Sequence, residues 1–148
     1  MTAREYMCAA RDAVLFLREQ PGRIEAKRQL AVMRARREVP APRGGVTDPT
    51  ARIDDLIQSE MDAEREASEA ARAVEDAMAV LRGLGRIDPG GASVLRMRYM
   101  MTAPWRSIAE ACGLSYDEVR AMESRAMDMI DANGIAAIRA GETPVTGN

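Results

Sequence analysis

The clearest pattern of apolar and polar positions lies between residues 105 and 129. Apolar or small side chains recur at three- and four-residue spacing to Cys112, stop over residues 113–115, and resume from Val119. This spacing predicts two helices that share one small core. Gly113 suits the left-handed backbone that ends a helix, and the hydroxyl of Ser115 can cap the next one. The segment therefore predicts a helix-turn-helix unit.

A further helix is expected before this unit. Asp88 followed by Pro89 predicts a capped helix start, with the proline in the first turn, where its missing amide costs nothing. The apolar positions then continue to about Met101. Residues 92–134 are therefore predicted to form a three-helix domain. Residues 135–148 are predicted to be a mostly disordered tail, with one helical turn at most.

Residues 1–91 carry two longer helical patterns. The first runs from about residue 2 to residue 38 and is interrupted at Pro21, because a proline inside a helix costs roughly 3 kcal/mol. Two helices or one kinked helix would both fit, and we expect a break. Prolines and glycines at about residues 39–47 predict a flexible loop. The second pattern starts after residue 48 and runs to about Leu81, where Gly83 and its neighbours are expected to end the helix.

The helix predicted at residues 49–82 needs a partner along its length. Its apolar side chains form a seam of alternating three- and four-residue steps, and a helix of this length spans on the order of 50 Å. The N-terminal segment is basic and residues 47–88 are acidic, which favours pairing within the chain. A homo-oligomer formed through the 49–82 helix would cover the same seam, so both arrangements stay open.

Composition indicates an all-α protein: an N-terminal long helical hairpin or coiled coil followed by the C-terminal three-helix domain. Aromatic residues make up only 3% of the 148 residues, and alternating strand-like patterns are hard to find. The chain has no histidine, which is the commonest general base and metal ligand, and its two cysteines are far apart. We therefore expect no enzyme activity, no catalytic residues, no bound metal and no cofactor.

The chain also lacks the sequence signals of a membrane or secreted protein. No apolar run approaches the roughly 18 residues of a membrane span. Charged residues occupy the N-terminal positions where a signal peptide would need an uninterrupted apolar stretch. We therefore expect a cytoplasmic protein with no membrane partner.

The C-terminal unit resembles region 4 of bacterial sigma factors, the module that reads a promoter element. The resemblance rests on VLRMRY at residues 94–99, W-x-x-I-A at residues 105–109, and GLS-x-x-x-VR-x-x-x-x-RA at residues 113–126. The opening MTAREY and the long Ala/Glu/Arg helix are similar to phage-encoded transcription regulators of the RinA/ArpU type. This resemblance implies binding of double-stranded DNA near a promoter, contacts with RNA polymerase as an open possibility, and no catalysis.

The resemblance places the base-reading residues in the second helix of the unit. Helical spacing is expected to put Asp117, Arg120, Ala121 and Ser124 on the outward face of this helix. Arg120 can form a bidentate pair of hydrogen bonds with guanine, and Asp117 can accept a hydrogen bond from a cytosine amino group. Arg106, Ser115 and Arg125 are placed for phosphates. The complete set of predicted DNA-binding residues is Arg106, Ser115, Tyr116, Asp117, Glu118, Arg120, Ala121, Ser124 and Arg125.

The charge of this unit keeps two other functions open. Between residues 105 and 131 acids outnumber arginines, although phosphate neutralisation supplies most of the non-specific affinity for DNA. An adaptor that engages RNA polymerase or a sigma factor without reading DNA would use the same fold. A recognition subunit for DNA packaging is a third alternative, because it would also pair a helix-turn-helix with a coiled coil.

Overall fold

The computed structural model describes residues 1–37 and 49–141. Every regular element among these residues is a helix, which confirms the all-α class. The elements are α1 (Ala3–Arg37), α2 (Pro49–Ile87), α3 (Pro89–Leu95), the π-helix η1 (Arg96–Met100), α4 (Trp105–Cys112), α5 (Tyr116–Asn133) and α6 (Ile135–Ala140). None of these helices combines the length and apolar character needed to cross a membrane. The loop predicted at residues 39–47 lies outside the described residues.

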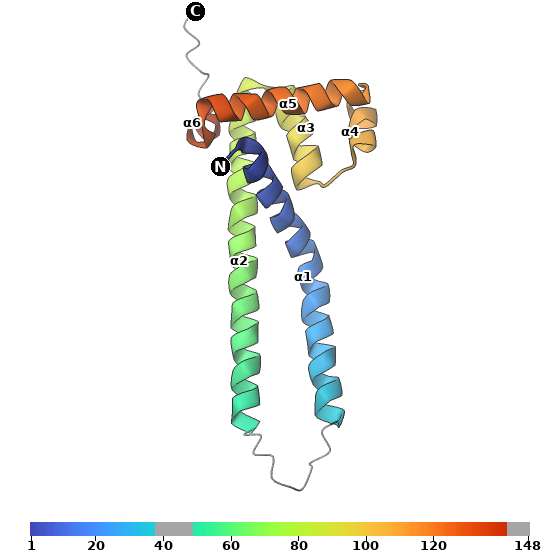
Figure 1. The fold of residues 1–148 in the computed structure, drawn as a ribbon, viewed down its shortest axis with the longest axis vertical. Helices are drawn as coiled ribbons and strands as arrows, with labels where there is room; N and C mark the ends of the chain where they lie inside the picture. The colour runs from blue at the N-terminus through green and yellow to red at the C-terminus, as the bar shows by residue number, and fades with distance from the viewer. Residues whose placement is uncertain (38–48, 142–148) are drawn as a thin grey trace, which may run out of the picture.

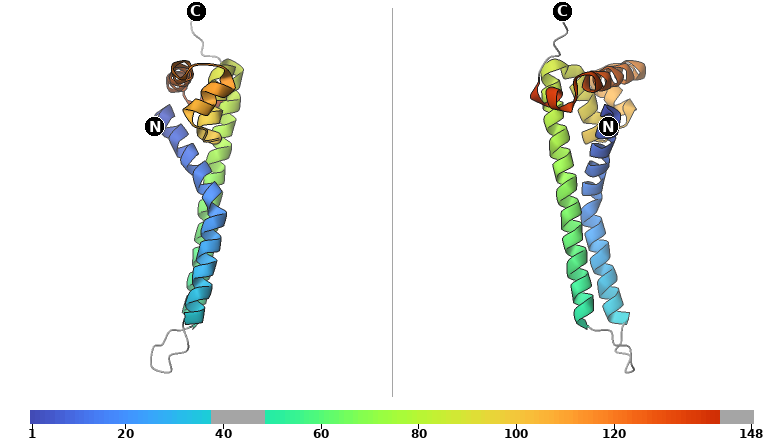
Figure 2. Two further views of the ribbon diagram at one scale, coloured as in Figure 1. Left: turned by 90° about the vertical axis from the view of Figure 1, so that its right-hand side faces the viewer. Right: turned by 60° about the vertical axis from the view of Figure 1, so that its left-hand side comes forward.

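The two long helices α1 and α2 lie side by side and run antiparallel, and we call this pair the stalk (Figure 1). The remaining elements, α3 to α6, gather at one end of the stalk and are called the head. Helix α5 crosses this end, with α3 and α4 beneath one half of it and α6 near the other (Figure 1). Figure 2 shows that the head lies beside the N-terminal end of α1 and the C-terminal end of α2.

Local sequence explains where the stalk begins. Thr2 and Glu5 form a reciprocal cap, in which the Thr2 amide donates to the Glu5 carboxylate at 2.9 Å and the Glu5 amide donates to the Thr2 hydroxyl at 3.2 Å. The next amide, that of Ala3, donates to the carboxylate of Asp131 at 2.7 Å. The first turn of α1 is therefore both capped and attached to α5.

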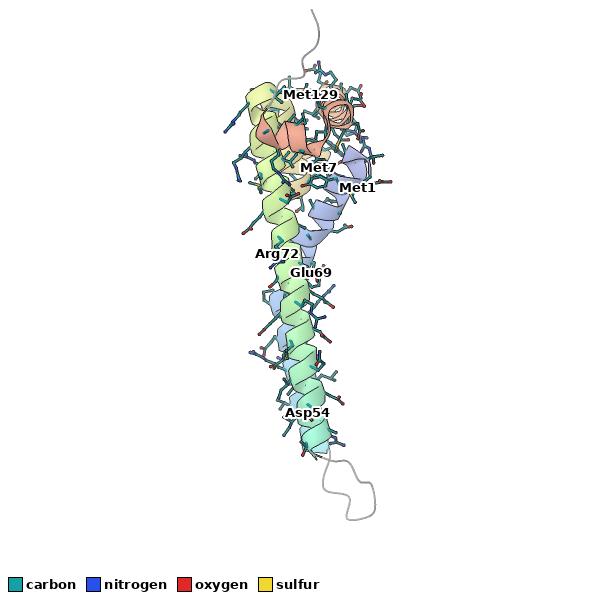
Figure 3. The ribbon with its side chains drawn as sticks, turned by 90° about the vertical axis from the view of Figure 1, so that its left-hand side faces the viewer. Met1, Met7, Asp54, Glu69, Arg72 and Met129 are labelled. Atoms are coloured by element: carbon teal, nitrogen blue, oxygen red, sulfur yellow. The ribbon has the colours of Figure 1, made fainter. Side chains whose placement is uncertain are left out.

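The larger core lies where the stalk meets the head. It takes buried side chains from every described element except α4, including Met7, Leu81, Leu84, Leu95, Tyr99, Ile130 and Ile138. Polar contacts reinforce the junction, because the carboxylate of Asp76 accepts a hydrogen bond from Tyr6 and pairs with Arg139. This single carboxylate joins α1, α2 and α6. Figure 3 shows Met7 at this junction and Asp54 near the far end of the stalk.

The far end of the stalk leaves large apolar side chains uncovered. Each of them is between 49% and 58% exposed, although they come from both helices of the pair. They are Leu30, Val32, Met33, Ile53, Leu56, Ile57 and Met61, and we call this set the distal apolar patch. The seam predicted for the second long helix is therefore buried within the chain only near the head.

Helix α1 passes through Pro21, where the sequence predicted a break. The proline lacks the amide that would bond the carbonyl of Leu17, but its ring is exposed and the freed carbonyl can bond water. Figure 2 shows that α1 changes direction along its length, as expected of a helix that contains a proline. Helix α1 therefore accommodates Pro21 by bending, and it does not end there.

Helix α2 continues through Gly83 to Ile87, so the predicted helix end at Gly83 is wrong. The glycine is buried, and a Cβ built at this position would lie 1.9 Å from the carbonyl oxygen of Ile138. Gly83 thus allows the backbone of α6 to approach α2 closely. A packing requirement, not a helix terminus, explains this glycine.

The first residues of the predicted tail are helical. Residues 135–140 form α6, because Ile138 is fully buried against the main core and holds this helix in place. Residues 142–148 lie outside the described residues. The helix predicted to reach Met101 is instead divided, with η1 following α3 directly.

Candidate nucleic-acid interface

The predicted helix pair in the head is joined by a tight turn. Gly113 has φ 65° and ψ 31°, which is the left-handed conformation expected of it, and its amide bonds the carbonyl of Glu110. The Ser115 hydroxyl accepts from the amide of Glu118 at 3.2 Å and caps α5. Both local predictions for this turn are confirmed.

A small second core holds α3, α4 and α5 together. It consists of Val94, Ile108 and Val119, one from each helix, and all three are completely buried. Trp105 packs against this cluster at the start of α4 but stays partly exposed. The cluster fixes the direction of α5 and therefore the face that α5 turns away from the molecule.

All nine predicted DNA-binding residues are exposed. One group lies opposite the buried side of α5, because at about 100° per residue Asp117, Ala121 and Ser124 point away from Val119. The nine residues are Arg106, Ser115, Tyr116, Asp117, Glu118, Arg120, Ala121, Ser124 and Arg125. The head therefore leaves one side of α5 open along its first half.

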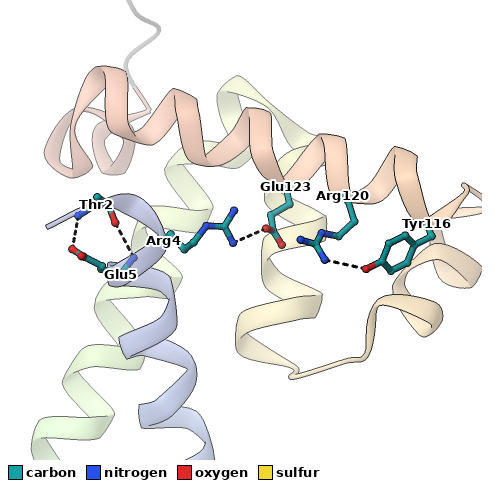
Figure 4. A network of polar contacts seen from close by, with 6 residues as sticks. All are labelled: Thr2, Arg4, Glu5, Tyr116, Arg120 and Glu123. Atoms are coloured by element: carbon teal, nitrogen blue, oxygen red, sulfur yellow. Dashed lines mark hydrogen bonds and ion pairs between the residues drawn. The ribbon is translucent and has the colours of Figure 1, made fainter.

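Two of the nine, Tyr116 and Arg120, lie on the side of α5 that faces α1 (Figure 4), so the predicted outward position of Arg120 is wrong. Arg120 donates from Nη1 to the Tyr116 hydroxyl at 3.0 Å, and its guanidinium carbon lies 4.7 Å from the centre of the Trp105 ring. The guanidinium of Arg98 lies at the same distance from that ring. Such cation–π contacts contribute about 0.5–2 kcal/mol and hold both guanidinium groups near the indole.

Sequence reasoning missed Glu123, which is 1% exposed. Its Oε1 pairs with Nη1 of Arg4 at 3.0 Å, which joins α5 to α1, and its Oε2 is buried without a hydrogen-bond partner. One signal was present in the sequence: Glu123 lies four residues after Val119 and three before Ala126, on the apolar stripe of the helix. An acid on such a stripe indicates a buried charge with a partner.

These contacts raise the pKa of two groups beside Glu123. The hydrogen bond to Glu123 raises the pKa of Arg4 above its ordinary value. Burial raises the pKa of Tyr99, and the negative charge of Glu123 raises it further. Arg4 therefore keeps its positive charge and Tyr99 its phenolic proton at neutral pH. Among the described residues, no group of three Cys, Asp or Glu side chains is arranged to hold a metal ion.

The exposed side of α5 is chemically mixed. It carries the acids Asp117 and Glu118 near the turn and Arg125 further along. A shallow groove of about 550 Å³ lies beside them, lined by Leu114, Glu118, Ala121, Met122 and Arg125. This side of the head therefore offers both charged and apolar contacts. No protein-family model, curated protein or solved structure matches this chain.

Proposed function

We propose that α4, the turn and α5 act as a helix-turn-helix similar to sigma factor region 4, and that the protein is a phage-type transcription regulator that binds double-stranded DNA. The observation that supports this best is the uncovered outward face of α5, from Asp117 to Ser124. A helix with its side chains is about 10–12 Å across and fits a major groove about 12 Å wide.

Five of the nine exposed residues then have a specific role in the complex. Asp117 and Ala121 face base edges, where the carboxylate accepts from a cytosine amino group and the small methyl group allows close approach to a thymine methyl. Arg106 and Arg125 contact phosphates on either side of the groove. Arg120 reaches guanine after its guanidinium leaves Trp105.

A protein-binding adaptor is the second candidate, and the groove beside α5 favours it. Three of the groove's five lining residues, Leu114, Ala121 and Met122, are apolar. An apolar anchor from RNA polymerase or a sigma factor would fit such a groove. In an adaptor, the acids Asp117 and Glu118 at the start of α5 would repel DNA, and this repulsion would not conflict with the function.

We also propose that a second copy of the chain covers the distal apolar patch. The exposed charged side chains near the patch are unequal on the two helices. On α1, Arg23 and Arg28 outnumber Glu25, and on α2, Asp54, Asp55 and Glu60 outnumber Arg52. In a two-fold pair of stalks, α1 of each copy lies against α2 of the other, so opposite charges flank the buried apolar side chains. Such a dimer carries two heads and doubles the contacts with DNA.

Fluorescence anisotropy with labelled DNA tests the proposed function. A duplex enriched from a random-sequence library is compared with a scrambled duplex of the same composition, each over a range of salt concentrations. Arg125→Ala should weaken binding to both duplexes and lower the salt slope by about one. Arg120→Ala should weaken only the enriched duplex, by about tenfold or more.

The control is Arg72→Ala, which removes an exposed arginine from the stalk (Figure 3) and should leave both affinities unchanged. The DNA proposal fails if the wild type shows no salt-dependent affinity for either duplex, and the adaptor is then the better function. It fails equally if the control variant loses as much affinity as Arg125→Ala.

A further inference from the structure

A cleft of about 260 Å³ lies between the N-terminal part of α1 and the head. Figure 4 shows part of its wall, with Arg4 of α1 reaching toward α5 beside Arg120. Four arginines line the cleft against two carboxylates: Arg4 and Arg11 from α1, Arg98 from η1 and Arg120 from α5, with Asp12 and Glu123. The cleft therefore carries an excess of positive charge.

Two polar atoms in the walls of this cleft lack partners. Nε of Arg11, on α1, is a buried donor without an acceptor. Oε2 of Glu123, on α5, is a buried acceptor without a donor. Leaving a buried polar group unpaired is costly, so a polar group bound beside these two atoms would stabilise the site.

The other arginines are held in position but keep free donors. Arg98 and Arg120 stack on Trp105, and each gives Nη1 to one protein acceptor, the carbonyl of Ala103 and the hydroxyl of Tyr116. A guanidinium has five N–H donors, so most of them remain for a ligand. Arg98 belongs to the π-helix η1. Turns of π-helix are rare in proteins overall, and many of those that occur lie at functional sites.

We propose that this cleft binds a small phosphate-bearing anion. The phosphate oxygens accept from guanidinium groups that come from α1, η1 and α5, and such charge-assisted bonds are strong. A protonated phosphate oxygen, or a hydroxyl of a phosphate ester, donates to Glu123. The volume is below the roughly 300–1,000 Å³ of pockets that hold drug-sized ligands, which suits free phosphate or a small phosphomonoester.

Occupancy of the cleft joins the stalk to the head. Arg4 and Arg11 belong to the stalk, whereas Arg98 and Arg120 belong to the head, so one anion contacts both. This site does not depend on DNA binding. It does share Arg120 with the proposed DNA surface, and a bound anion would keep that guanidinium inside the cleft.

Trp105 is the only tryptophan of the chain and lines the cleft, so its fluorescence reports directly on the site. The full-length protein is titrated with inorganic phosphate and, separately, with ribose 5-phosphate, while sodium chloride keeps the ionic strength constant. Both titrations should give a saturable fluorescence change and raise the melting temperature. Tighter binding of ribose 5-phosphate means that the ester part is also recognised, and equal affinity means that the phosphoryl group alone is recognised.

Arg11→Gln should weaken binding of phosphate by about tenfold or more, because it removes one charged donor. Arg11→Lys keeps the positive charge but lacks the planar guanidinium, so it should bind phosphate with intermediate affinity. Arg72→Gln, on the stalk outside the cleft, should bind like the wild type, and circular dichroism checks that each variant is folded.

Three results would overturn the proposal. The first is a fluorescence change that does not saturate and is equal for phosphate and chloride. The second is unchanged phosphate affinity in folded Arg11→Gln. The third is a response to duplex DNA but not to phosphate, which would make the cleft part of the DNA surface. The DNA measurements are made without phosphate, so failure of the regulator function and failure of this site give different results.

Discussion

Gly83 gives the sharpest test of how the head is attached to the stalk. A Cβ added at this position would lie 1.9 Å from the carbonyl oxygen of Ile138 and 2.6 Å from that of Arg139. Both atoms are backbone atoms of α6, so no side-chain rotation relieves the overlap. Gly83→Ala must therefore move α6 away from α2 and loosen the packing of Ile138, which is fully buried.

Two opposing effects set the size of the change. Replacing glycine by alanine inside a helix adds about 0.5–1 kcal/mol to the free energy of unfolding. Overpacking a well-filled site removes about 1–3 kcal/mol, and a backbone overlap of this size belongs at the upper end. We therefore expect Gly83→Ala to lower the free energy of unfolding by about 2–2.5 kcal/mol.

Gly22→Ala is the matched control, because Gly22 lies inside α1 and a Cβ there meets nothing within 4 Å. This variant should gain up to about 1 kcal/mol. Urea denaturation followed by circular dichroism measures both changes, and equal slopes against urea show that the two variants expose the same surface on unfolding. If Gly83→Ala is as stable as Gly22→Ala, the close packing of α6 on α2 is refuted.

Two further predictions concern the α1–α5 link and the distal apolar patch. Arg4→Ala should lower the free energy of unfolding by about 2–4 kcal/mol, because Glu123 stays buried without its cation. Glu123→Gln should lower the free energy of unfolding by less, because Arg4 is 53% exposed and its guanidinium can be hydrated instead. Equal losses in urea denaturation would contradict this. If the proposed dimer forms, Ile57→Glu should convert it to a monomer in sedimentation equilibrium and Ser59→Glu should not. A monomeric wild type would refute the proposed dimer.

The sequence by itself determined the features that depend on neighbours a few residues away. Hydrophobic spacing together with composition predicted an all-helical chain. Spacing also predicted the outward positions of Asp117, Ala121 and Ser124 on α5, because a helix repeats every 3.6 residues wherever it occurs. The turn between α4 and α5 was equally readable: Gly113 needs no partner to adopt positive φ, and Ser115 caps an amide only three residues away. Local chemistry is sufficient for such features.

Only the tertiary structure decided the features that depend on distant partners. Gly83 is a packing residue because α6 returns to it from more than fifty positions along the chain, and Pro21 is tolerated because its exposed side reaches water. Glu123 is buried because Arg4, at the other end of the sequence, meets it. Arg120 turns toward the cleft because Trp105 and Tyr116 hold it there. The physical reason is the same throughout: burial and pairing energies depend on which surfaces meet, and local periodicity carries no information about partners far along the chain.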